Sequence, residues 1–148
     1  MQISKADVNV RVFTIAEYSK VIEFWSNIDG LALDEFADTA EAIAAFLERN
    51  PGFSAVALDA NDQIIGAVLC GHNGRAGALY HLAVAEPHRG KGIALALVSH
   101  CYAKLTEAKI PRCNIFVYSD NDEGNRFWLL NGFVDPTTWK VMQKRLEP

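Results

Sequence analysis

Metal-binding and disulfide patterns are scarce in this sequence of 148 residues. It has three cysteines, Cys70, Cys101 and Cys113, and none of them belongs to a C-x-x-C pair or to a Cys/His cluster with the spacing of zinc ligands. Neither a zinc site nor a disulfide framework is therefore expected, and we predict no metal cofactor. The thiols are predicted to be reduced and mostly buried, as is usual in a cytosolic protein.

An excess of positive charge and a long apolar run are also absent. The 14 Lys and Arg residues are outnumbered by 18 Asp and Glu residues, which gives a formal net charge of −4. This balance gives no support for general nucleic-acid binding. The first residues lack an apolar core of signal-peptide length, and no stretch reaches the length of a membrane span. We therefore expect a cytoplasmic protein that binds neither nucleic acid nor a membrane.

The remaining composition is that of one folded domain. Half of the residues are hydrophobic (50%), which argues against disorder. A chain of this length is typical of a single domain and buries about 70% of its unfolded surface on folding. No internal repeat or low-complexity tract is visible. We therefore expect one domain over residues 1–148.

The most informative stretch is residues 82–97, which read LAVAEPHRGKGIALAL. It begins as an apolar strand, breaks at an acidic residue followed by proline, passes through a basic glycine loop and continues as an amphipathic helix. Gly90 and Gly92 have no Cβ atom to keep a ligand away from the backbone. The first turn of a helix offers N–H groups without intrahelical partners and favours negative charge. With Arg89 and Lys91 beside these glycines, the stretch is typical of a phosphate-binding loop.

Three kinds of phosphate loop can be compared with this stretch. A Walker A loop needs Ser or Thr after its Gly-Lys pair, but Gly92 follows Lys91 here. A dinucleotide fingerprint needs a third glycine where this chain has Leu95. The third pattern, Arg-x-x-Gly-x-Gly/Ala after a strand, is matched by Arg89, Gly92 and Ala94. The alternative without function is a solvated connection between a strand and a helix.

Hydrophobic periodicity places the other elements along the chain. Alternating or continuous apolar runs predict strands over residues 8–13, 53–58, 63–70, 78–84, 113–118, 133–134 and 139–146. Apolar residues at helical intervals predict helices over residues 15–25, 38–49, 93–108 and 122–130. The order is therefore strand, two helices, three strands, helix, strand, helix and the last strands.

The third loop pattern and this order of elements resemble the GNAT superfamily of N-acetyltransferases, in which such a loop binds acetyl-CoA. A second stretch resembles the family's late Asn-x-x-Ala-x-x-Phe-Tyr…Gly-Phe segment; it consists of Asn121, Gly124, Phe127 and Trp128, followed by Gly132 and Phe133. The stretches RNPGFSAVA, GAVLCGHNGRAG and LYHLAV also resemble a bacterial subgroup of the family. The resemblance thus covers nearly the whole chain.

The resemblance implies an α/β (α+β) single-domain GNAT fold. Its central sheet would be mixed and mostly antiparallel, with about six to seven strands and about four flanking helices. In this fold the central strand and the strand after it splay apart, here just beyond Val84 and Val117. A homodimer is left open, since dimers are common among such proteins.

The implied reaction is direct transfer of an acetyl group from acetyl-CoA to a primary amine of a small molecule or peptide, without a covalent enzyme intermediate. Leu82, Ala83 and Val84 would bind the pantetheine arm and the acetyl carbonyl. The pyrophosphate would accept N–H groups from the residues of the loop: Arg89, Gly90, Lys91, Gly92, Ile93 and Ala94. Asn121 would contact the pantetheine or adenine side, and a helix N-cap is an equally good explanation for this residue.

At one position the chain departs from the family pattern. The usual Tyr, which gives a proton to the leaving thiolate, is replaced by Trp128, and an indole N–H cannot act as an acid near neutral pH. Trp128 would instead wall the thioester site or serve as a core residue, while Tyr118 is another candidate proton donor. A non-catalytic acyl-CoA-binding protein on the same fold is therefore the alternative function. A domain that uses the fold only as a partner surface would bind no CoA.

The general base is sought on the strand before the loop, where Tyr80 and His81 lie. Adjacent residues of a strand point to opposite faces, so we expect at most one of these two to face any one cleft. A histidine is well suited to deprotonate an amine, although a strand histidine is also commonly structural. Water that carries the proton outward would need neither side chain.

The acceptor pocket is expected beside the first two helices and their loop. Four acids concentrate there: Asp29, Asp34, Glu35 and Asp38. They would suit a cationic amine, and an acidic surface loop without function explains the same residues equally well. His72 and Arg75, in the glycine-rich connection over residues 71–77, would line the pocket or simply lie on a solvated turn.

Overall fold

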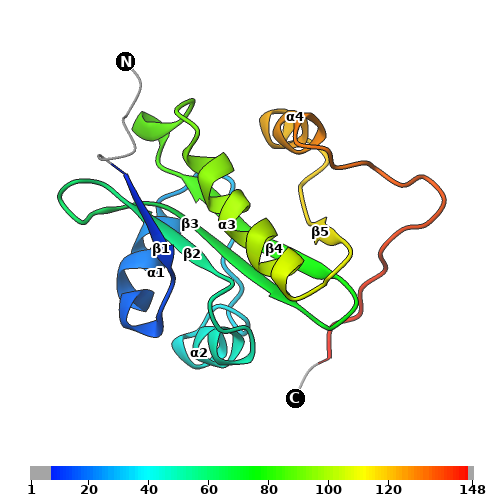
Figure 1. The fold of residues 1–148 in the computed structure, drawn as a ribbon, viewed down its shortest axis with the longest axis horizontal. Helices are drawn as coiled ribbons and strands as arrows, with labels where there is room; N and C mark the ends of the chain where they lie inside the picture. The colour runs from blue at the N-terminus through cyan, green and yellow to red at the C-terminus, as the bar shows by residue number, and fades with distance from the viewer. Residues whose placement is uncertain (1–7, 147–148) are drawn as a thin grey trace. The chain divides into compact units, whose positions relative to one another are not determined.

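The structure is a computed structural model that describes residues 8–146. The chain forms two compact units, of which the first ends at Phe116 and the second begins at Val117. The first unit holds the sheet and three of the helices, and the second holds the fourth helix and the segment that follows it (Figure 1).

The first unit contains one five-stranded sheet in the order β1-β2-β3-β4-β5. Its strands are β1 (Asn9–Val12), β2 (Ala55–Leu58), β3 (Ile64–His72), β4 (Gly77–Val84) and β5 (Cys113–Ile115). The first four strands are antiparallel to their neighbours, and β5 runs parallel to β4. The sheet is therefore mixed and mostly antiparallel, as the resemblance implied.

Two helices follow β1 and begin with the capping signals that the sequence carries. A 3₁₀ turn, Ile15–Glu17, leads into α1 (Tyr18–Ser26), and the carboxylate of Glu17 accepts a hydrogen bond from the backbone N–H of Thr14 at 3.2 Å. The second helix, α2 (Ala40–Arg49), starts after Thr39, whose hydroxyl accepts the N–H of Ala42 at 3.1 Å. The 3₁₀ turn begins at the predicted residue 15, whereas α1 itself begins three residues after it and α2 begins two residues after the predicted residue 38.

The third helix, α3 (Ile93–Glu107), covers the face of the sheet that is opposite to α1 and α2 (Figure 1). The predicted apolar stripe is buried throughout: Ile93, Leu97, Cys101 and Leu105. A Cβ atom added to Gly77 of β4 would lie 2.7 Å from the side chain of Leu105, whereas one added to Gly71 of β3 would lie 2.9 Å from Phe46 of α2. The two faces of the sheet are thus packed against different helices.

The three thiols lie close to one another in the first unit. Cys70 of β3 and Cys101 of α3 are buried, and Cys113 of β5 is half-buried. The hydrogen bond with Cys70, together with burial, raises the pKa of the Cys101 thiol. Burial also raises the pKa of the Cys113 thiol, to about 12. Two of the three thiols are buried, which agrees with the prediction that they are mostly buried.

The second unit consists of α4 (Asp122–Leu130) and an irregular segment after it. Gly132 adopts φ +90°, the N–H of Phe133 donates to the carbonyl of Trp128 at 3.0 Å, and the N–H of Gly132 donates to that of Leu129 at 3.3 Å. This pair of bonds is a Schellman motif. The prediction of a left-handed glycine after this helix is therefore confirmed.

The strands predicted over residues 133–134 and 139–146 are absent, so the sheet has five strands rather than six to seven. Pro136 follows closely after the glycine turn and lacks an N–H group for a ladder. Val141, Met142 and Leu146 are exposed, so the alternating residues bury no apolar face. The strand predicted over 113–118 is also shorter and ends at Ile115.

Candidate active site

One edge of β4 is only partly covered by its neighbour. The pairing between β4 and β5 consists of Gly77 with Cys113, Ala78 with Asn114 and Leu79 with Ile115. Beyond Leu79, no pairing of β4 with β5 occurs in residues 8–146. The two strands were predicted to separate just beyond Val84, but they already separate after Leu79. Backbone groups in the second half of β4 are left to pair with something else.

Strand alternation tells which groups of β4 point to this open edge. The N–H of Ala85 donates to the carbonyl of Ile65 at 2.8 Å, so Ala85 faces β3. In an antiparallel ladder the neighbouring residue, Val84, then points its polar groups to the other edge. The carbonyl of Val84 accepts a hydrogen bond there from Nε of Arg89 at 2.9 Å. The N–H of Val84 is consequently available at the open edge.

A β-bulge interrupts β4 at the candidate base. The register shifts between the pairs Ala67 with Ala83 and Leu69 with Tyr80, so β4 carries one extra residue, and His81 has φ +55°. A non-glycine residue in this left-handed region costs about 1–3 kcal/mol.

The bulge also changes which face the neighbouring side chains take. The ring of Tyr80 contacts Phe46 of α2 at 6.1 Å between centroids, and that of His81 contacts Trp25 of α1 at 5.1 Å. Both side chains therefore lie on the α1/α2 face. The expectation that at most one of them would face any one cleft is wrong, because strict alternation fails at a bulge.

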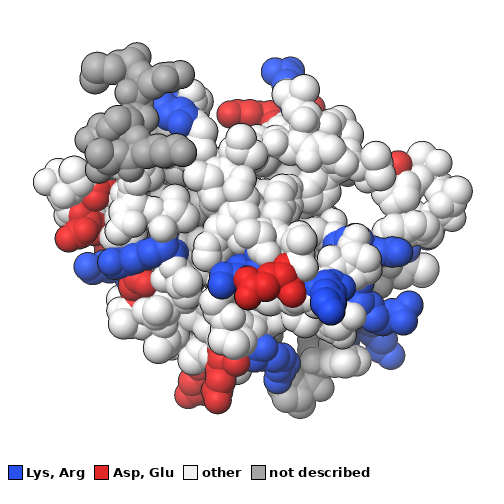
Figure 2. Space-filling model, in the orientation of Figure 1, with Lys and Arg blue, Asp and Glu red and all other residues white. Residues whose placement is uncertain are grey.

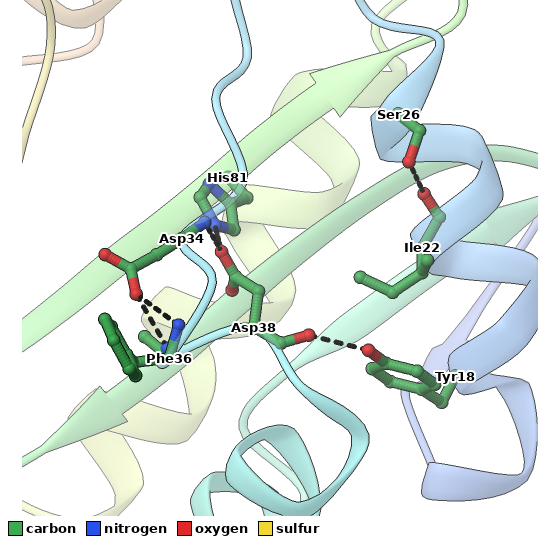
Figure 3. A network of polar contacts seen from close by, with 8 residues as sticks. Tyr18, Ile22, Ser26, Asp34, Phe36, Asp38 and His81 are labelled. Carbon is green, nitrogen blue, oxygen red and sulfur yellow. Dashed lines mark hydrogen bonds and ion pairs between the residues drawn. The ribbon is translucent and has the colours of Figure 1, made fainter.

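His81 forms a hydrogen-bonded pair with a buried carboxylate (Figure 3). Its Nε2 lies 2.9 Å from Oδ2 of Asp38, whose side chain is only 5% exposed. The same oxygen accepts the backbone N–H of Asp34 at 2.7 Å. A carboxylate this far from water needs such partners, since desolvation of an unpaired charge is costly. Both residues are candidates from the sequence alone, but no local pattern there pairs them.

The loop between α1 and α2 holds this carboxylate from several sides. Oδ1 of Asp34 accepts the N–H groups of Phe36 and Ala37, each at 2.8 Å. The hydroxyl of Tyr18 donates to the carbonyl of Asp38 at 2.7 Å (Figure 3). Two of the four acids expected to attract a cationic amine are therefore engaged in the loop itself, whereas Asp29 and Glu35 are exposed.

Aromatic rings surround the pair. The indole N–H of Trp25 is buried, and no hydrogen-bond partner for it occurs in the described part of the chain. The ring of Tyr80 stacks on that of Phe116 at 5.6 Å, with an angle of 14° between the planes, and burial raises the pKa of Tyr80. Tyr80 and Phe116 are both partly exposed, so they form an apolar rim near His81.

The glycine loop has the geometry of an anion site. Gly90 and Gly92 adopt φ +76° and +83°, and a Cβ atom added to either would meet nothing within 4 Å. The first intrahelical bond of α3 runs from the N–H of Ala96 to the carbonyl of Gly92, so the N–H groups of residues 93–95 have no partner inside the helix. The space and the donors fit an anionic group such as a phosphate.

One residue of the loop differs from expectation. The backbone N–H of Arg89 donates to the carbonyl of Glu86 at 3.2 Å, in the 3₁₀ turn Glu86–His88. This N–H was expected to bind the pyrophosphate but is engaged inside the protein. The side chains of Arg89 and Lys91 are exposed, and Arg89 keeps its cationic guanidinium at the loop while its Nε donates to the carbonyl of Val84.

The structure does not bring the other predicted acceptor residues to His81. Nδ1 of His72 accepts the N–H of Gly74 at 2.9 Å, and its ring contacts Phe53 at 5.1 Å. His72 pairs with Gly77, whose missing side chain would face α3, so His72 is on the face opposite to His81. Arg75 is exposed in the turn after β3. Acceptor binding by His72, Arg75 and Asp29 stays a prediction.

Three predicted site residues lie in the second unit. Asn121 is the N-cap of α4, because its Oδ1 accepts the N–H of Gly124 at 2.9 Å, which confirms that explanation of the residue. Trp128 is buried and its ring contacts those of Phe127 and Phe133, each at 5.0 Å. Tyr118 is exposed. Roles of these residues toward a ligand stay predictions.

Other classes of site find little support in residues 8–146. Within that range no group of three or more His, Cys, Asp or Glu side chains could hold a metal ion. None of the described helices combines the length and the apolar character that crossing a membrane requires. On the face drawn in Figure 2, both cationic and anionic side chains are exposed.

Comparison with known proteins assigns this chain to one family. The model of the acetyltransferase (GNAT) family matches residues 20–133. An uncharacterized N-acetyltransferase of Yersinia pestis is 34% identical over 115 residues, which are 78% of this chain and 79% of that protein.

Two solved structures have a similar fold. One is a GNAT-family acetyltransferase of Staphylococcus aureus Mu50, with a TM-score of 0.73, 16% identity and coverage of 91% and 92% of the two chains. The other is the PaiA N-acetyltransferase of Thermoplasma acidophilum in complex with coenzyme A, with a TM-score of 0.72, 18% identity and coverage of 86% and 89%. At these identities the likeness concerns the fold alone.

Proposed function

The chain belongs to the acetyltransferase (GNAT) family, and from that premise we propose that it transfers an acetyl group directly from acetyl-CoA to a primary amine of a small molecule or peptide. The name of the Yersinia pestis relative, an N-acetyltransferase, supports an amine as acceptor. The coenzyme A in the Thermoplasma acidophilum complex supports a CoA thioester as donor.

The observation that carries this proposal is the His81–Asp38 pair at the bulge of β4. The bulge lies where β4 has lost its pairing with β5, so the imidazole and the unpaired backbone edge belong to the same short segment. Acyl transfer to an amine needs a proton acceptor and an N–H donor for the oxyanion side by side. This segment offers both.

The donor would be held at two places. The open edge of β4 at residues 82–84 would bond the pantetheine arm as an added strand does. The phosphates would lie against residues 90–95, where Gly90 and Gly92 leave room, with Arg89 and Lys91 as cations. The N–H of Val84 would face the acetyl carbonyl and stabilise the charge that develops on it.

The chemical step does not require a separate general acid. An ammonium has no lone pair, so the amine must lose a proton before it attacks, and His81 would accept it. The leaving thiolate belongs to a group that titrates near pH ~8.5, so it departs readily without a proton donor. Trp128 would therefore not act as an acid.

A non-catalytic acyl-CoA binder is the second candidate function. The observation that favours it is Trp128 at the position of the family's Tyr. A binder, however, gains nothing from a buried carboxylate that holds a histidine in a strained bulge. The His81–Asp38 pair therefore favours the enzyme.

The test is release of free thiol from acetyl-CoA across a panel of amines that contains amino acids, polyamines, aminoglycosides and short peptides. We expect release that depends on one class of amine, with the acetylated product seen by mass spectrometry. Tight binding of acetyl-CoA in calorimetry without turnover on any amine would instead identify a binder.

A further inference from the structure

The contacts of Asp38 with His81 and Asp34 assign a specific role to its carboxylate. Resting on the proposed function, we propose that Asp38 is a positioning residue that keeps the proton of neutral His81 on Nε2. The other ring nitrogen, Nδ1, is then the atom that takes the proton from the acceptor amine. Asp38 itself touches neither substrate and acts only through His81.

The assignment of the two ring nitrogens follows from hydrogen-bond chemistry. Oδ2 of Asp38 lies 2.9 Å from Nε2 of His81 and 2.7 Å from the backbone N of Asp34. An ionised carboxylate only accepts hydrogen bonds, so the nitrogen that faces it must carry a hydrogen. A neutral imidazole has one N–H, and its lone pair is therefore on Nδ1.

The carboxylate is placed before any substrate arrives. Asp38 is buried, and its position is set by the N–H of Asp34 on the side-chain oxygen and by the hydroxyl of Tyr18 on its carbonyl. These contacts come from the loop and from α1, whereas His81 comes from β4 (Figure 3). A buried carboxylate at a set distance stabilises a neighbouring imidazolium without reorganisation.

The strain at His81 argues against a purely structural pair. Glycine adopts φ +55° at no cost. The chain instead keeps a side chain that must tolerate the left-handed conformation. Such strain concentrates where a functional group has to be aimed.

The proton and electron balance of the step is simple. The acceptor ammonium first gives one proton to Nδ1 of His81, which passes it to water. The neutral amine then forms a bond to the acetyl carbon, and the C–S bond breaks with its electron pair on the sulfur. The second proton leaves the nitrogen through Nδ1 of His81 and goes to the thiolate or to water. Asp38 stays ionised throughout.

A double-mutant cycle tests whether Asp38 acts through His81. Asp38→Asn keeps the shape and an oxygen for the N–H of Asp34 but removes the charge. We expect it to lower kcat by about 10²-fold in the native background and by less than about 3-fold in the His81→Asn background, with the Kd of acetyl-CoA unchanged in both. Equal losses in the two backgrounds would show that Asp38 serves only the fold and would overturn the proposal.

Glu48→Gln is the matched control for the charge change. Glu48 is exposed on α2, in the same unit as Asp38, and the substitution also removes one negative charge. We expect its kcat to equal that of the native protein. A loss as large as that of Asp38→Asn would mean that net charge, not the pair, governs the rate, and would also overturn the proposal.

The tautomer can be read without any turnover, which separates this inference from the proposed function. Two-bond ¹⁵N–¹H correlation spectra of the full chain with labelled histidines show which nitrogen of each ring is protonated, and the spectrum of His81→Asn identifies the signals of residue 81. We expect neutral His81 to carry its proton on Nε2. Protonation of Nδ1 would overturn the inference even if acetyl transfer is observed, and absence of transfer would overturn the proposed function alone.

Discussion

The two faces of the sheet in the first unit bury apolar side chains equally well, yet they differ in chemistry. The face under α3 holds Leu97, Cys101 and Leu105, all with at most 3% exposure, and its thiols stay neutral. The face under α1 and α2 holds an apolar core as well, but it also contains Asp38 with His81. Burial of apolar side chains therefore does not distinguish the candidate site from the rest of the core. The buried polar pair of Asp38 and His81 does.

Strand β4 is regularly paired in its first half and irregular in its second half. The first half of β4 is paired on both sides, with β3 and with β5. The second half contains the bulge, the positive φ of His81 and the open edge. Regular pairing would leave no backbone donor for a ligand, so the irregular half is the part that can do chemistry.

The largest effect is expected on the α1/α2 face, from His81→Asn. Asparagine tolerates the left-handed conformation, so the fold is retained, while the proton acceptor is lost. We expect kcat to fall by about 10²–10⁴-fold in the thiol-release assay. A rate within threefold of the native one would remove His81 from the mechanism.

On the α3 face a core substitution should act on stability only. Leu97→Ala removes a fully buried side chain, and we expect the free energy of unfolding to drop by about 2–5 kcal/mol in urea titrations. The kcat of the protein that remains folded should not change, because α3 contacts the face away from His81. A large fall in kcat at low temperature, where the variant is folded, would contradict the division of roles between the faces.

The glycine loop connects β4 to α3, and Gly92→Val tests its role in binding acetyl-CoA. Valine at φ +83° is strained by about 1–2 kcal/mol and fills the space where we place the phosphates. We expect the affinity for acetyl-CoA in calorimetry to fall by at least about tenfold.

Gly30→Val is the control for backbone strain in that experiment. Gly30 has the same φ of +83°, also meets nothing within 4 Å, and lies in the turn after α1. Its substitution should cost similar stability and leave the affinity for acetyl-CoA unchanged. Equal affinities of the two variants would dissociate the glycine loop from donor binding.

The smallest effect is expected from alkaline pH. Cys101 has a raised pKa, and burial raises the pKa of Cys113 and of Tyr102, each to about 12. In the unfolded chain a thiol titrates near pH ~8.5, so above that pH the folded state binds more protons than the unfolded state. The stability that these groups contribute is present below about pH 8.5 and is lost as the pH rises toward 12.

Thermal melts between pH 8 and 11 measure this loss, and Cys101→Ala separates the thiols from other groups. We expect the melting temperature of the native protein to fall with rising pH and that of the variant to fall less steeply. Identical slopes would mean that the buried thiols do not contribute.

Local signals in the sequence were enough for much of the fold. The stripe of α3 is buried as its four-residue spacing predicts, and Thr14 with Glu17 and Asn121 with Gly124 form the capping contacts that their spacing indicates. The strands predicted over residues 133–134 and 139–146 to complete the sheet are wrong, and the apolar residues of the second segment are exposed. Local signals succeed where neighbours in sequence are also neighbours in space.

The central feature of the site had no local signal. Asp38 and His81 are 43 residues apart in sequence, and each was considered for a different reason. The bulge that brings His81 and Tyr80 to one face was also invisible, since it depends on the register between β3 and β4. The position of Asp38 directly before the N-cap Thr39 could have drawn attention to it. The residues next to it in the sequence, however, do not indicate that a histidine is its partner.

Chemical rescue of His81→Gly tests the account most directly. Glycine fits φ +55° and leaves a ring-sized space beside Asp38 and Trp25. With the acceptor found in the amine panel, the account predicts that added imidazole restores thiol release in a concentration-dependent manner, while 1-methylpyrrole, a ring of similar size without a basic nitrogen, does not. A variant that binds acetyl-CoA with native affinity but responds equally to both compounds, or to neither, would contradict proton transfer at this site.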